Sequence, residues 1–507
     1  MRLLRRNALG VYAVYAAAIV SGFVVTPVVI HSIGTSAFGV WSFIGSVTIY
    51  LSILDFGVGP SIIRFAAEAE GRRAPDDLNE IASTGLAMYA VIGLLTLPIG
   101  LALAWVVPTA IGAPQNLVWD ARLTTLLVVI SLAVRFPLGL FNNLLVSRQR
   151  WDLQNLANLV STVLYALLVA LLIPHWGGIV LLGALTLGTT VLRLSLPLAW
   201  LRRELPQLRI GRRFVSRRRL RALTAFSSSN FLVHIAQKIV FSTDVIVVSV
   251  VLGAVAAGVY SVPAKLFALA FGLGTAVTSL MFPAFAELHG AGDTDRQQRL
   301  LLIGLRSGTA LMLVLALPLL LIPDLLIHGW IGGGFRGSYP VMALLAGVLL
   351  VHQPIYVLTQ FLIAVGRQRA IALVSIATTL ANLGFSFLLA WRWGIWGVAL
   401  STLVTDVLAL AWIVPQIVAP AALIPVSKIV RALGRPIVPA LVAAVVVLVG
   451  VARVWEPRTL FALVPLGALW VFVAGATIWR FGLAQNERSQ FMRELLRRRG
   501  PALPDPG

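Results

Sequence analysis

Long runs of apolar residues alternate with short polar segments along the whole chain. Each run reaches roughly the 20 residues that a helix needs to cross a hydrocarbon core about 30 Å thick. The pattern therefore predicts an all-α polytopic membrane protein with about 14 transmembrane helices. The predicted spans are 8–32, 38–62, 81–107, 122–146, 155–173, 177–200, 223–252, 256–283, 301–328, 339–365, 371–391, 394–417, 436–454 and 459–480.

The composition and the charges agree with this interpretation. Hydrophobic residues make up 59% of the 507 residues, above the roughly 45–50% of soluble domains. If the N-terminus starts in the cytoplasm, the inner segments hold 30 of the 40 Lys and Arg residues. The positive-inside rule then predicts that both termini are cytoplasmic. The first apolar run is longer than that of a signal peptide, so we expect a retained first helix.

The same features exclude several classes of function. The formal net charge of +21 is spread over many short loops, which fits membrane lipid head groups and not a nucleic-acid surface. The chain has no cysteine, so disulfides and cysteine-based metal sites are excluded. No P-loop and no HExxH motif occurs, and we expect no cofactor and no metal site.

Two segments 219 residues apart are similar in sequence. Residues 28–43 and 247–262 share seven of sixteen positions, and the same order of landmarks follows each of them. Because the offset spans six predicted helices, an even number, the two copies have the same orientation. Parallel repeats of this kind are typical of transporters. The landmarks are SRQR and GRQR ending at Arg150 and Arg369, Pro137 and Pro354, and HWGG and RWGI at 175–178 and 392–395.

The repeat predicts two six-helix lobes around a central cavity, followed by a final helix pair. The segment 202–221 carries nine arginines. It is either an ordinary loop that fixes topology or the linker between the lobes. An amphipathic placement in the membrane interface is also open, with Leu208, Ile210, Phe214, Val215 and Leu220 as the apolar side. The predicted parts are an N-lobe at 1–200, a basic linker at 201–222, a C-lobe at 223–417, and the last helices with a basic tail at 418–507.

The segment 34–68 carries a recognisable pattern. It contains G-x4-G-x-W from Gly34, then D-F-G-x-G from Asp55 with Arg64 following, and it leads into the acidic loop EAEGRRAPDDLNEI. This pattern resembles polysaccharide exporters and O-antigen flippases of the multidrug/oligosaccharidyl-lipid/polysaccharide (MOP) superfamily. The resemblance implies a V-shaped two-lobe fold that works by alternating access. It also implies a polyprenyl-diphosphate-linked oligosaccharide as substrate, moved across a bacterial cytoplasmic membrane, and it suggests Asp55 and Arg64 as gate or cavity residues.

Cations inside the spans are candidates for substrate binding, because each is costly there. Asn230, His234 and Lys238 recur at steps of four on one helical face that begins at Ser227. That face is either a cavity wall or an interhelical hydrogen-bonding surface. Arg135 lies mid-span beside the Phe136-Pro137 bend, and with Lys238 and Lys265 it would form a cationic cavity for a diphosphate. Arg64, Arg193 and Arg306 lie near inner ends, where long side chains reach the interface.

Three carboxylates are candidates for ion coupling or gating: Asp55, Asp244 and Asp406. Asp244 either pairs with Lys265 or has a purely structural role. Asp406 either cycles a proton or is satisfied by Thr402 or Thr405. Coupling to protons or to sodium therefore stays open, and His352 is interpreted as structural.

Two other functions remain as alternatives to the flippase. An efflux antiporter for cationic drugs would need an acidic cavity, whereas the mid-span charges lean positive. A membrane polymerase or glycosyltransferase would need a large aqueous loop with paired carboxylates, which the sequence lacks. We therefore expect a non-enzymatic transporter. We also expect a monomer, because both lobes are fused in one chain.

Overall fold

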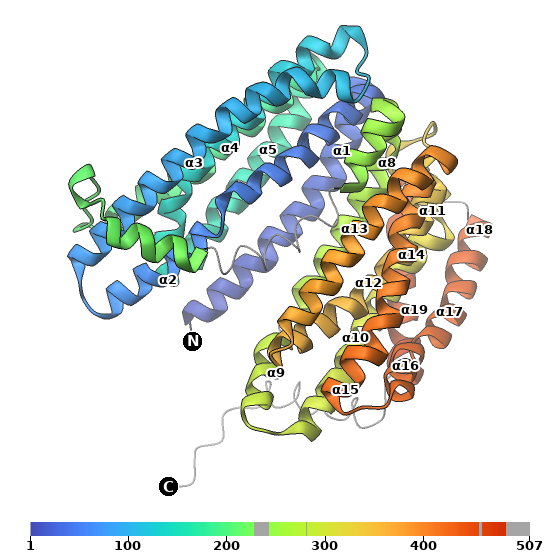
Figure 1. The fold of residues 1–507 in the computed structure, drawn as a ribbon. Helices are drawn as coiled ribbons and strands as arrows, with labels where there is room; N and C mark the ends of the chain where they lie inside the picture. Colours follow the sequence, from blue (N-terminus) through green and yellow to red (C-terminus); the bar gives the residue numbers. More distant parts are fainter. Residues whose placement is uncertain (1, 228–242, 280, 456–458, 483–507) are drawn as a thin grey trace. The chain divides into compact units, whose positions relative to one another are not determined.

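The computed structural model describes residues 2–227, 243–279, 281–455 and 459–482. Within these ranges the chain forms helices joined by turns, and no β-strand occurs there (Figure 1). Twelve helices in the described part are long and apolar enough to cross a membrane. The prediction of an all-α multi-pass membrane protein is confirmed. The count of fourteen stays a prediction, because two of the twelve candidates run to 43 and 48 residues and contain a kink.

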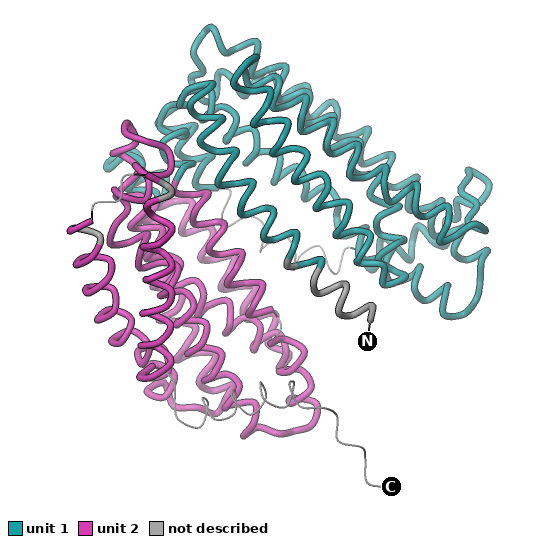
Figure 2. Tube along the Cα trace, turned by 180° about the vertical axis from the view of Figure 1, so that it is seen from behind, with its two compact units in different colours: residues 1–262, 386–398 teal, residues 263–385, 399–507 magenta. Residues whose placement is uncertain are grey.

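The chain divides into two compact units (Figure 2). Unit 1 comprises Met1–Val262 and Ser386–Val398, and unit 2 comprises Pro263–Phe385 and Ala399–Gly507. The division into lobes at residues 201–222 stays a prediction. Each unit has its own clusters of buried apolar side chains.

In unit 1, helix α4 packs along both α3 and α6, while α5 lies against α1 and α6. Its elements are α1 (Arg2–Leu51), the 3-10 helix η1 (Ser52–Asp55), α2 (Val58–Gly71), α3 (Pro75–Ala110), η2 (Gln115–Leu117), α4 (Val118–Ser147), α5 (Trp151–Trp176), α6 (Ile179–Glu204), η3 (Arg212–Phe214), the first part of α8 (Thr243–Thr278), the end of α13 (Gln368–Trp393) and the start of α14 (Ile395–Ile413).

In unit 2, the last helices pack against α10, where the Trp470 indole donates a hydrogen bond to the Val314 carbonyl at 2.7 Å. Beyond the rest of α8, its elements are α9 (Met281–Gly290), α10 (Thr294–Leu321), α11 (Pro323–Ile331), α12 (Ser338–Ala364), most of α13 (Gln368–Trp393) and α14 (Ile395–Ile413), η4 (Val414–Val418), α15 (Ala419–Ala422), α16 (Val426–Gly434), α17 (Ile437–Ala444), η5 (Val445–Val451), α18 (Ala452–Trp455), α19 (Leu460–Thr477) and η6 (Ile478–Gly482).

The repeated segments adopt matching backbone conformations. Gly34 in α1 has φ 81° and ψ 166°, and Gly253 in α8 has φ 86° and ψ 176°. Only glycine adopts such angles at low cost, and each residue breaks its long helix into two arms. The sequence similarity at an offset of 219 residues therefore coincides with the same kink in both copies.

The two kinked helices also cross each other at glycines within unit 1. A Cβ added to Gly39 would lie 1.8 Å from the Ala254 carbonyl oxygen, and one added to Gly258 would lie 2.2 Å from that of Thr35. Both distances are shorter than any real contact, so only glycine allows the backbones to approach this closely. The contact is reciprocal, because Thr35 and Ala254 also correspond at the offset of 219.

The arginine-rich segment folds back onto the start of α3. Arg218 and Arg219 form ion pairs with Asp77 and Glu80. Three backbone amides of the segment donate to polar side chains of α3: Arg209 to Asn79, Gly211 to Ser83 and Ser216 to Thr84. The segment is thus an ordered part of unit 1.

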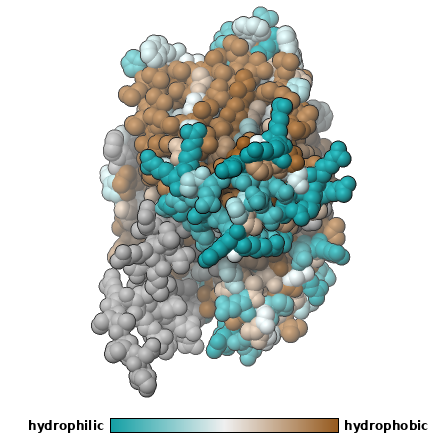
Figure 3. Space-filling model, turned by 90° about the vertical axis from the view of Figure 1, so that its left-hand side faces the viewer, coloured by the Kyte–Doolittle hydropathy of each residue, from teal (hydrophilic) through white to brown (hydrophobic). Residues whose placement is uncertain are grey.

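Only some of the apolar side chains of this segment are directed toward protein. Leu208 and Ile210 are partly buried against the buried cluster that contains Leu78 and Leu201. Val215 and Leu220 are exposed. Figure 3 faces the left-hand side of Figure 1 and shows a hydrophilic patch at this end, beside apolar surface. Eight arginines of the segment are exposed: Arg202, Arg203, Arg209, Arg212, Arg213, Arg217, Arg218 and Arg221.

Candidate functional site

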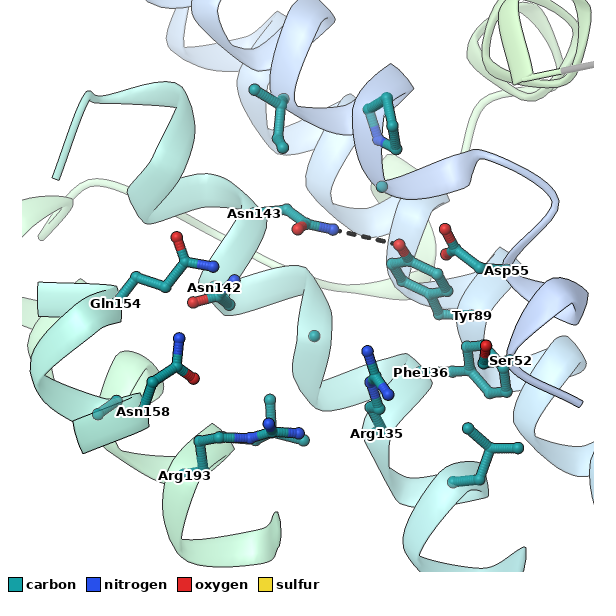
Figure 4. A pocket seen from close by; sticks show the side chains of 17 residues that line it. Ser52, Asp55, Tyr89, Arg135, Phe136, Asn142, Asn143, Gln154, Asn158 and Arg193 are labelled. Atoms are coloured by element: carbon teal, nitrogen blue, oxygen red, sulfur yellow. Dashed lines mark hydrogen bonds between the residues drawn. The ribbon is translucent and has the colours of Figure 1, made fainter. Parts of the chain in front are cut away.

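Unit 1 contains a polar cavity of about 360 Å³ between its helices (Figure 4). Six elements line it: η1, α2, α3, α4, α5 and α6. Polar or charged side chains form much of its wall, although most of it lies among helices that are apolar enough to cross a membrane. These side chains are Ser52, Asp55, Tyr89, Arg135, Asn142, Asn143, Gln154, Asn158 and Arg193.

Helical spacing explains why these side chains meet. On α4, Arg135, Gly139 and Asn142 are four and three residues apart, so they lie on one face. On α5, Gln154 and Asn158 are four residues apart and also share a face. A Cβ at Gly139 would meet no atom within 4 Å, so this glycine leaves open space inside the cavity.

A break in the helix places Asp55. The 3-10 helix η1 ends at Asp55, and the next two residues, Phe56 and Gly57, have φ of 48° and 77° before α2 begins. Left-handed backbone at two successive residues ends the helical hydrogen-bonding pattern. Asp55 therefore lies where the chain turns out of one helix and into the next.

Asp55 belongs to a network that includes Tyr89 and Asn143. The Asn143 amide donates to the Tyr89 hydroxyl at 3.1 Å, and the Tyr89 hydroxyl is hydrogen-bonded to Asp55. The ring of Tyr89 stacks on Phe136 with centroids 6.2 Å apart, which fixes its orientation. At Gly59 an added Cβ would come within 3.2 Å of both the Tyr89 hydroxyl and the Asn143 amide. The glycine therefore leaves room for the network.

Two guanidinium groups line the same cavity. Arg135 is exposed to it and Arg193 is half-buried, and the two are close enough to interact electrostatically. The Arg193 Nε is buried without a hydrogen-bond partner. Neither arginine forms an ion pair with an acidic side chain in the described part of the chain. Two guanidinium groups and one carboxylate, that of Asp55, line the cavity. The cavity therefore has an excess of positive charge and is suited to an anion.

Amide side chains occupy the remaining polar wall. Asn142 and Asn143 come from α4, and Gln154 and Asn158 come from α5. The Gln154 Oε1 atom is buried and has no hydrogen-bond partner. Each amide offers both donors and an acceptor, so this wall complements the arginines, which only donate.

Beyond the cavity, an ion pair joins α2 to the turn after α4. Arg148 Nη1 lies 3.6 Å from Glu70 Oε2. Burial raises the pKa of Glu70, and the positive charge of Arg148 offsets only part of that effect. This end of unit 1 is therefore both charged and partly dehydrated.

The structure brings together two of the residues that the sequence singled out, Arg135 and Asp55. Arg64 does not line the cavity. It is exposed, pairs with Glu68 at 3.0 Å, and its guanidinium lies 4.6 Å from the centroid of the Phe226 ring. Asn230, His234 and Lys238 lie outside the described residues. Ser227, at the start of the same predicted face, hydrogen-bonds to Ser61 of α2 at 2.5 Å.

The other candidates lie elsewhere. Asp244 is buried in unit 1 and accepts a hydrogen bond from Tyr260 at 2.8 Å. Lys265 is half-buried and belongs to unit 2. Asp406, also in unit 2, is buried and lies 2.8 Å from Nδ1 of His352. Roles for these residues in transport stay predictions.

Several cavity residues were not recognised from the sequence. Arg193 was expected to reach the membrane interface, yet it lines the cavity. Tyr89 and the amides were not considered at all. The available signal was the recurrence of Asn and Gln at helical spacing within apolar spans, at 142–143 and at 154 and 158. In the described part of the chain no group of three or more His, Asp or Glu side chains is placed to hold a metal ion.

The sequence of this chain matches a known protein family. The profile of the family described as "Polysaccharide biosynthesis protein" matches residues 4–289, more than half of the chain and all of the cavity wall. The chain belongs to this family. The resemblance to membrane proteins of polysaccharide biosynthesis, inferred from residues 34–68, is thereby confirmed.

Individual relatives are distant in sequence but cover most of the chain. An "Uncharacterized membrane protein EpsK" of Bacillus subtilis (strain 168) is 23% identical over 402 residues, which is 77% of this chain and 78% of that protein. The solved structure "Lipid II flippase MurJ, inward closed conformation" has a TM-score of 0.73 at 12% identity, covering 93% of this chain and 99% of that one. An inward-facing MATE multidrug transporter of the MOP superfamily has a TM-score of 0.66 at 16% identity, covering 79% and 93%. These two likenesses show a shared fold.

Proposed function

We propose that this protein is a flippase that moves a lipid-linked saccharide precursor from the inner to the outer leaflet of a bacterial cytoplasmic membrane by alternating access. The substrate is a polyprenyl-diphosphate-linked oligosaccharide. Membership of the polysaccharide biosynthesis family supports this proposal, as does the fold shared with the lipid II flippase MurJ. The observation that carries it is the pair Arg135 and Arg193 lining one polar cavity.

The chemistry of the cavity fits the head of such a lipid. A guanidinium group donates parallel hydrogen bonds to phosphate oxygens, and hydrogen bonds to charged groups contribute about 1.5–3 kcal/mol each. A bound diphosphate would also relieve the repulsion between Arg135 and Arg193. A cationic drug would instead meet two positive charges, so this cavity disfavours the efflux alternative.

The position of the cavity fits loading from the cytoplasmic side. Asn142 lies five residues before the end of α4 at Ser147, and Gln154 lies three residues after the start of α5 at Trp151. The turn between these helices joins the fourth and fifth predicted spans, 122–146 and 155–173, so with a cytoplasmic N-terminus it lies on the cytoplasmic side. A lipid head in the inner leaflet would therefore reach the cavity directly, and both chain termini are assigned to the same side.

Proton coupling is assigned to the pair His352 and Asp406 in unit 2. The His352 Nδ1 atom and the Asp406 carboxylate oxygen lie 2.8 Å apart, which is close enough for a proton to pass directly between them. The reconstituted protein should transport faster when a pH gradient is imposed than without one. A response to a sodium gradient alone would overturn this assignment.

The proposed function is tested by depleting the protein in its native host and weighing polyprenyl-diphosphate-linked glycans by mass spectrometry. One lipid-linked oligosaccharide should accumulate in depleted cells, and the wild-type gene should clear it. The Arg135→Ala, Arg193→Ala double variant should fail to clear it. Arg122→Ala is the matched control, because Arg122 stacks on Trp105 at 4.1 Å outside the cavity.

Two results would contradict the proposal. The first is intact surface glycans with no accumulated lipid-linked intermediate, which would direct attention to efflux of cationic drugs. The second is full clearance by the double arginine variant, which would remove the cavity from the mechanism.

A further inference from the structure

The cavity contains a set of side chains that phosphate binding does not explain. Figure 4 shows Asn142, Gln154 and Asn158 grouped on one side, Asp55 and Tyr89 on the other, and the two arginines extending toward the space between them. A site for a phosphate alone needs donors. The amide side chains also provide hydrogen-bond acceptors. These acceptors would be satisfied by a ligand that has hydrogen-bond donors of its own.

We propose that Asn142, Gln154 and Asn158 bind the hydroxyl groups of the sugar that is attached directly to the diphosphate. These three amides form a sugar subsite beside the phosphate-binding arginines. This inference rests on the proposed function, and it adds that the cavity distinguishes a sugar-bearing lipid from the bare carrier.

Hydrogen-bond accounting supports a sugar at this place. Arg193 Nε is a buried donor without a partner, and Gln154 Oε1 is a buried acceptor without a partner. An ionised phosphate ester has only acceptors and can satisfy the first atom but not the second. A sugar hydroxyl both donates and accepts, as serine and threonine hydroxyls do. A phosphorylated sugar therefore satisfies both atoms with one ligand.

The spacing on α4 suits a head group with two parts. Asn142 lies seven residues after Arg135, a rise of about 10 Å along the helix at 1.5 Å per residue. A phosphate at Arg135 therefore leaves room for a neighbouring sugar ring at Asn142. Gly139 lies between them and places no side chain in that space.

The volume limits how much of the substrate is recognised. At about 360 Å³, the cavity is at the lower end of the roughly 300–1,000 Å³ of ligand pockets. It holds the sugar next to the diphosphate and not a whole oligosaccharide. The subsite thus recognises only the sugar next to the diphosphate. Lipid-linked glycans of different lengths that begin with the same sugar would therefore bind alike.

Equilibrium binding to the full chain in lipid nanodiscs tests this subsite. The probes are a short polyprenyl diphosphate without sugar and the same carrier bearing glucose, galactose or N-acetylglucosamine. Wild-type protein should bind at least one sugar-bearing probe about tenfold more tightly than the bare carrier, since amide–hydroxyl hydrogen bonds are individually modest. Gln154→Ala and Asn158→Ala should each remove most of this preference, because they should weaken binding of the sugar-bearing probe far more than binding of the bare carrier.

The controls separate this inference from the proposed function. Gln115→Ala, at an exposed amide in η2, should behave as wild type. Arg135→Ala should weaken all probes alike. If wild type binds the bare carrier but prefers no sugar, or if the amide variants weaken all probes equally, the sugar subsite is wrong while the flippase proposal stands. If wild type binds none of the probes, the proposed function itself fails.

Discussion

Each unit has a nitrogen-containing side chain two residues before a proline that bends a helix. The surroundings of this side chain differ between the two units. In α4 of unit 1, Arg135 precedes the bending Pro137 by two residues. In α12 of unit 2, His352 precedes Pro354 by two residues. Arg135 is exposed to a polar cavity, whereas His352 lies 2.8 Å from the buried carboxylate of Asp406.

The two units share the backbone features that shape their helices but differ in the polar side chains beside the prolines. The kinks at Gly34 and Gly253 and the close contacts at Gly39 and Gly258 are nearly the same in both copies. The residues beside the prolines are not. An uncompensated charge inside a membrane protein is costly and indicates a ligand, while a charge beside a buried partner indicates an internal proton or structural site. On this basis we propose anion binding for unit 1 and proton transfer for the His352–Asp406 pair of unit 2.

Exchanging the base in unit 1 should have the largest effect. Arg135→His leaves a neutral imidazole at neutral pH, so transport should fall about 10- to 100-fold through loss of a charge-assisted hydrogen bond. Lowering the pH toward 5.5 should restore part of the rate, because the imidazole then becomes charged. Transport by reconstituted protein measures both effects.

Arg122→His is the control for this exchange and should keep the wild-type rate at both pH values. A variant that is equally slow at every pH would show that the shape of the guanidinium matters and not its charge alone. A variant as fast as wild type would remove Arg135 from the anion site.

Substitutions at Gly39 and Gly258, where α1 and α8 cross, should have the second-largest effect. Gly39→Ala and Gly258→Ala each drive a Cβ into a backbone carbonyl, and overpacking of this kind costs about 1–3 kcal/mol. Both variants should lower the thermal unfolding temperature of the purified protein by similar amounts. Gly45→Ala on the same helix meets no atom within 4 Å and should not destabilise. A loss in only one of the two variants would contradict the reciprocal packing.

Much of the fold could be predicted from the sequence because membrane insertion depends on local composition. The apolar windows, the basic inner segments and the repeated glycines each carry their information within a few residues. The kinks at Gly34 and Gly253 lie within the similar segments that revealed the repeat. The helix break after Asp55 falls in the D-F-G-x-G pattern, where glycine supplies the left-handed backbone of residue 57.

The site was harder to predict because depth along a helix does not fix the direction of a side chain. Arg193 has the depth of a residue that reaches the interface, yet its position on α6 turns it toward the cavity. The docking of residues 202–221 onto Asp77 and Glu80 depends on pairing across more than 100 positions. No local pattern indicates that pairing.

Substitution of His352 in unit 2 should have a smaller effect on transport, and only when a pH gradient is imposed. In His352→Gln the amide can still donate a hydrogen bond to Asp406 but cannot accept a proton from it. The rate under an imposed pH gradient should therefore fall several-fold, to the rate measured without a gradient, since one pH unit of driving force is worth about 1.4 kcal/mol per proton. His328→Gln, at the end of α11, is the control. A variant that still responds fully to the gradient would remove this pair from coupling.

The ends of the two units that carry the segments predicted to be cytoplasmic should give the smallest effects, and they should differ in their response to salt. In unit 1 the arginine-rich segment is held by Arg218 and Arg219 on Asp77 and Glu80. Ion pairs at the protein surface contribute about 0.2–1 kcal/mol each and are screened by salt. Asp77→Asn, Glu80→Gln should therefore lower the unfolding temperature slightly at low ionic strength and not at about 0.5 M salt.

The corresponding substitution in unit 2 removes a hydrogen bond between uncharged groups. The Gln298 amide donates to the Ala422 carbonyl at 2.9 Å, so Gln298→Ala should cost about 1 kcal/mol at either salt concentration. Equal salt dependence in both variants would mean that charge does not distinguish the two ends. A salt-dependent loss in unit 1 alone would extend the comparison from the cavity to the surface, with unit 1 relying on charge and unit 2 on neutral hydrogen bonds.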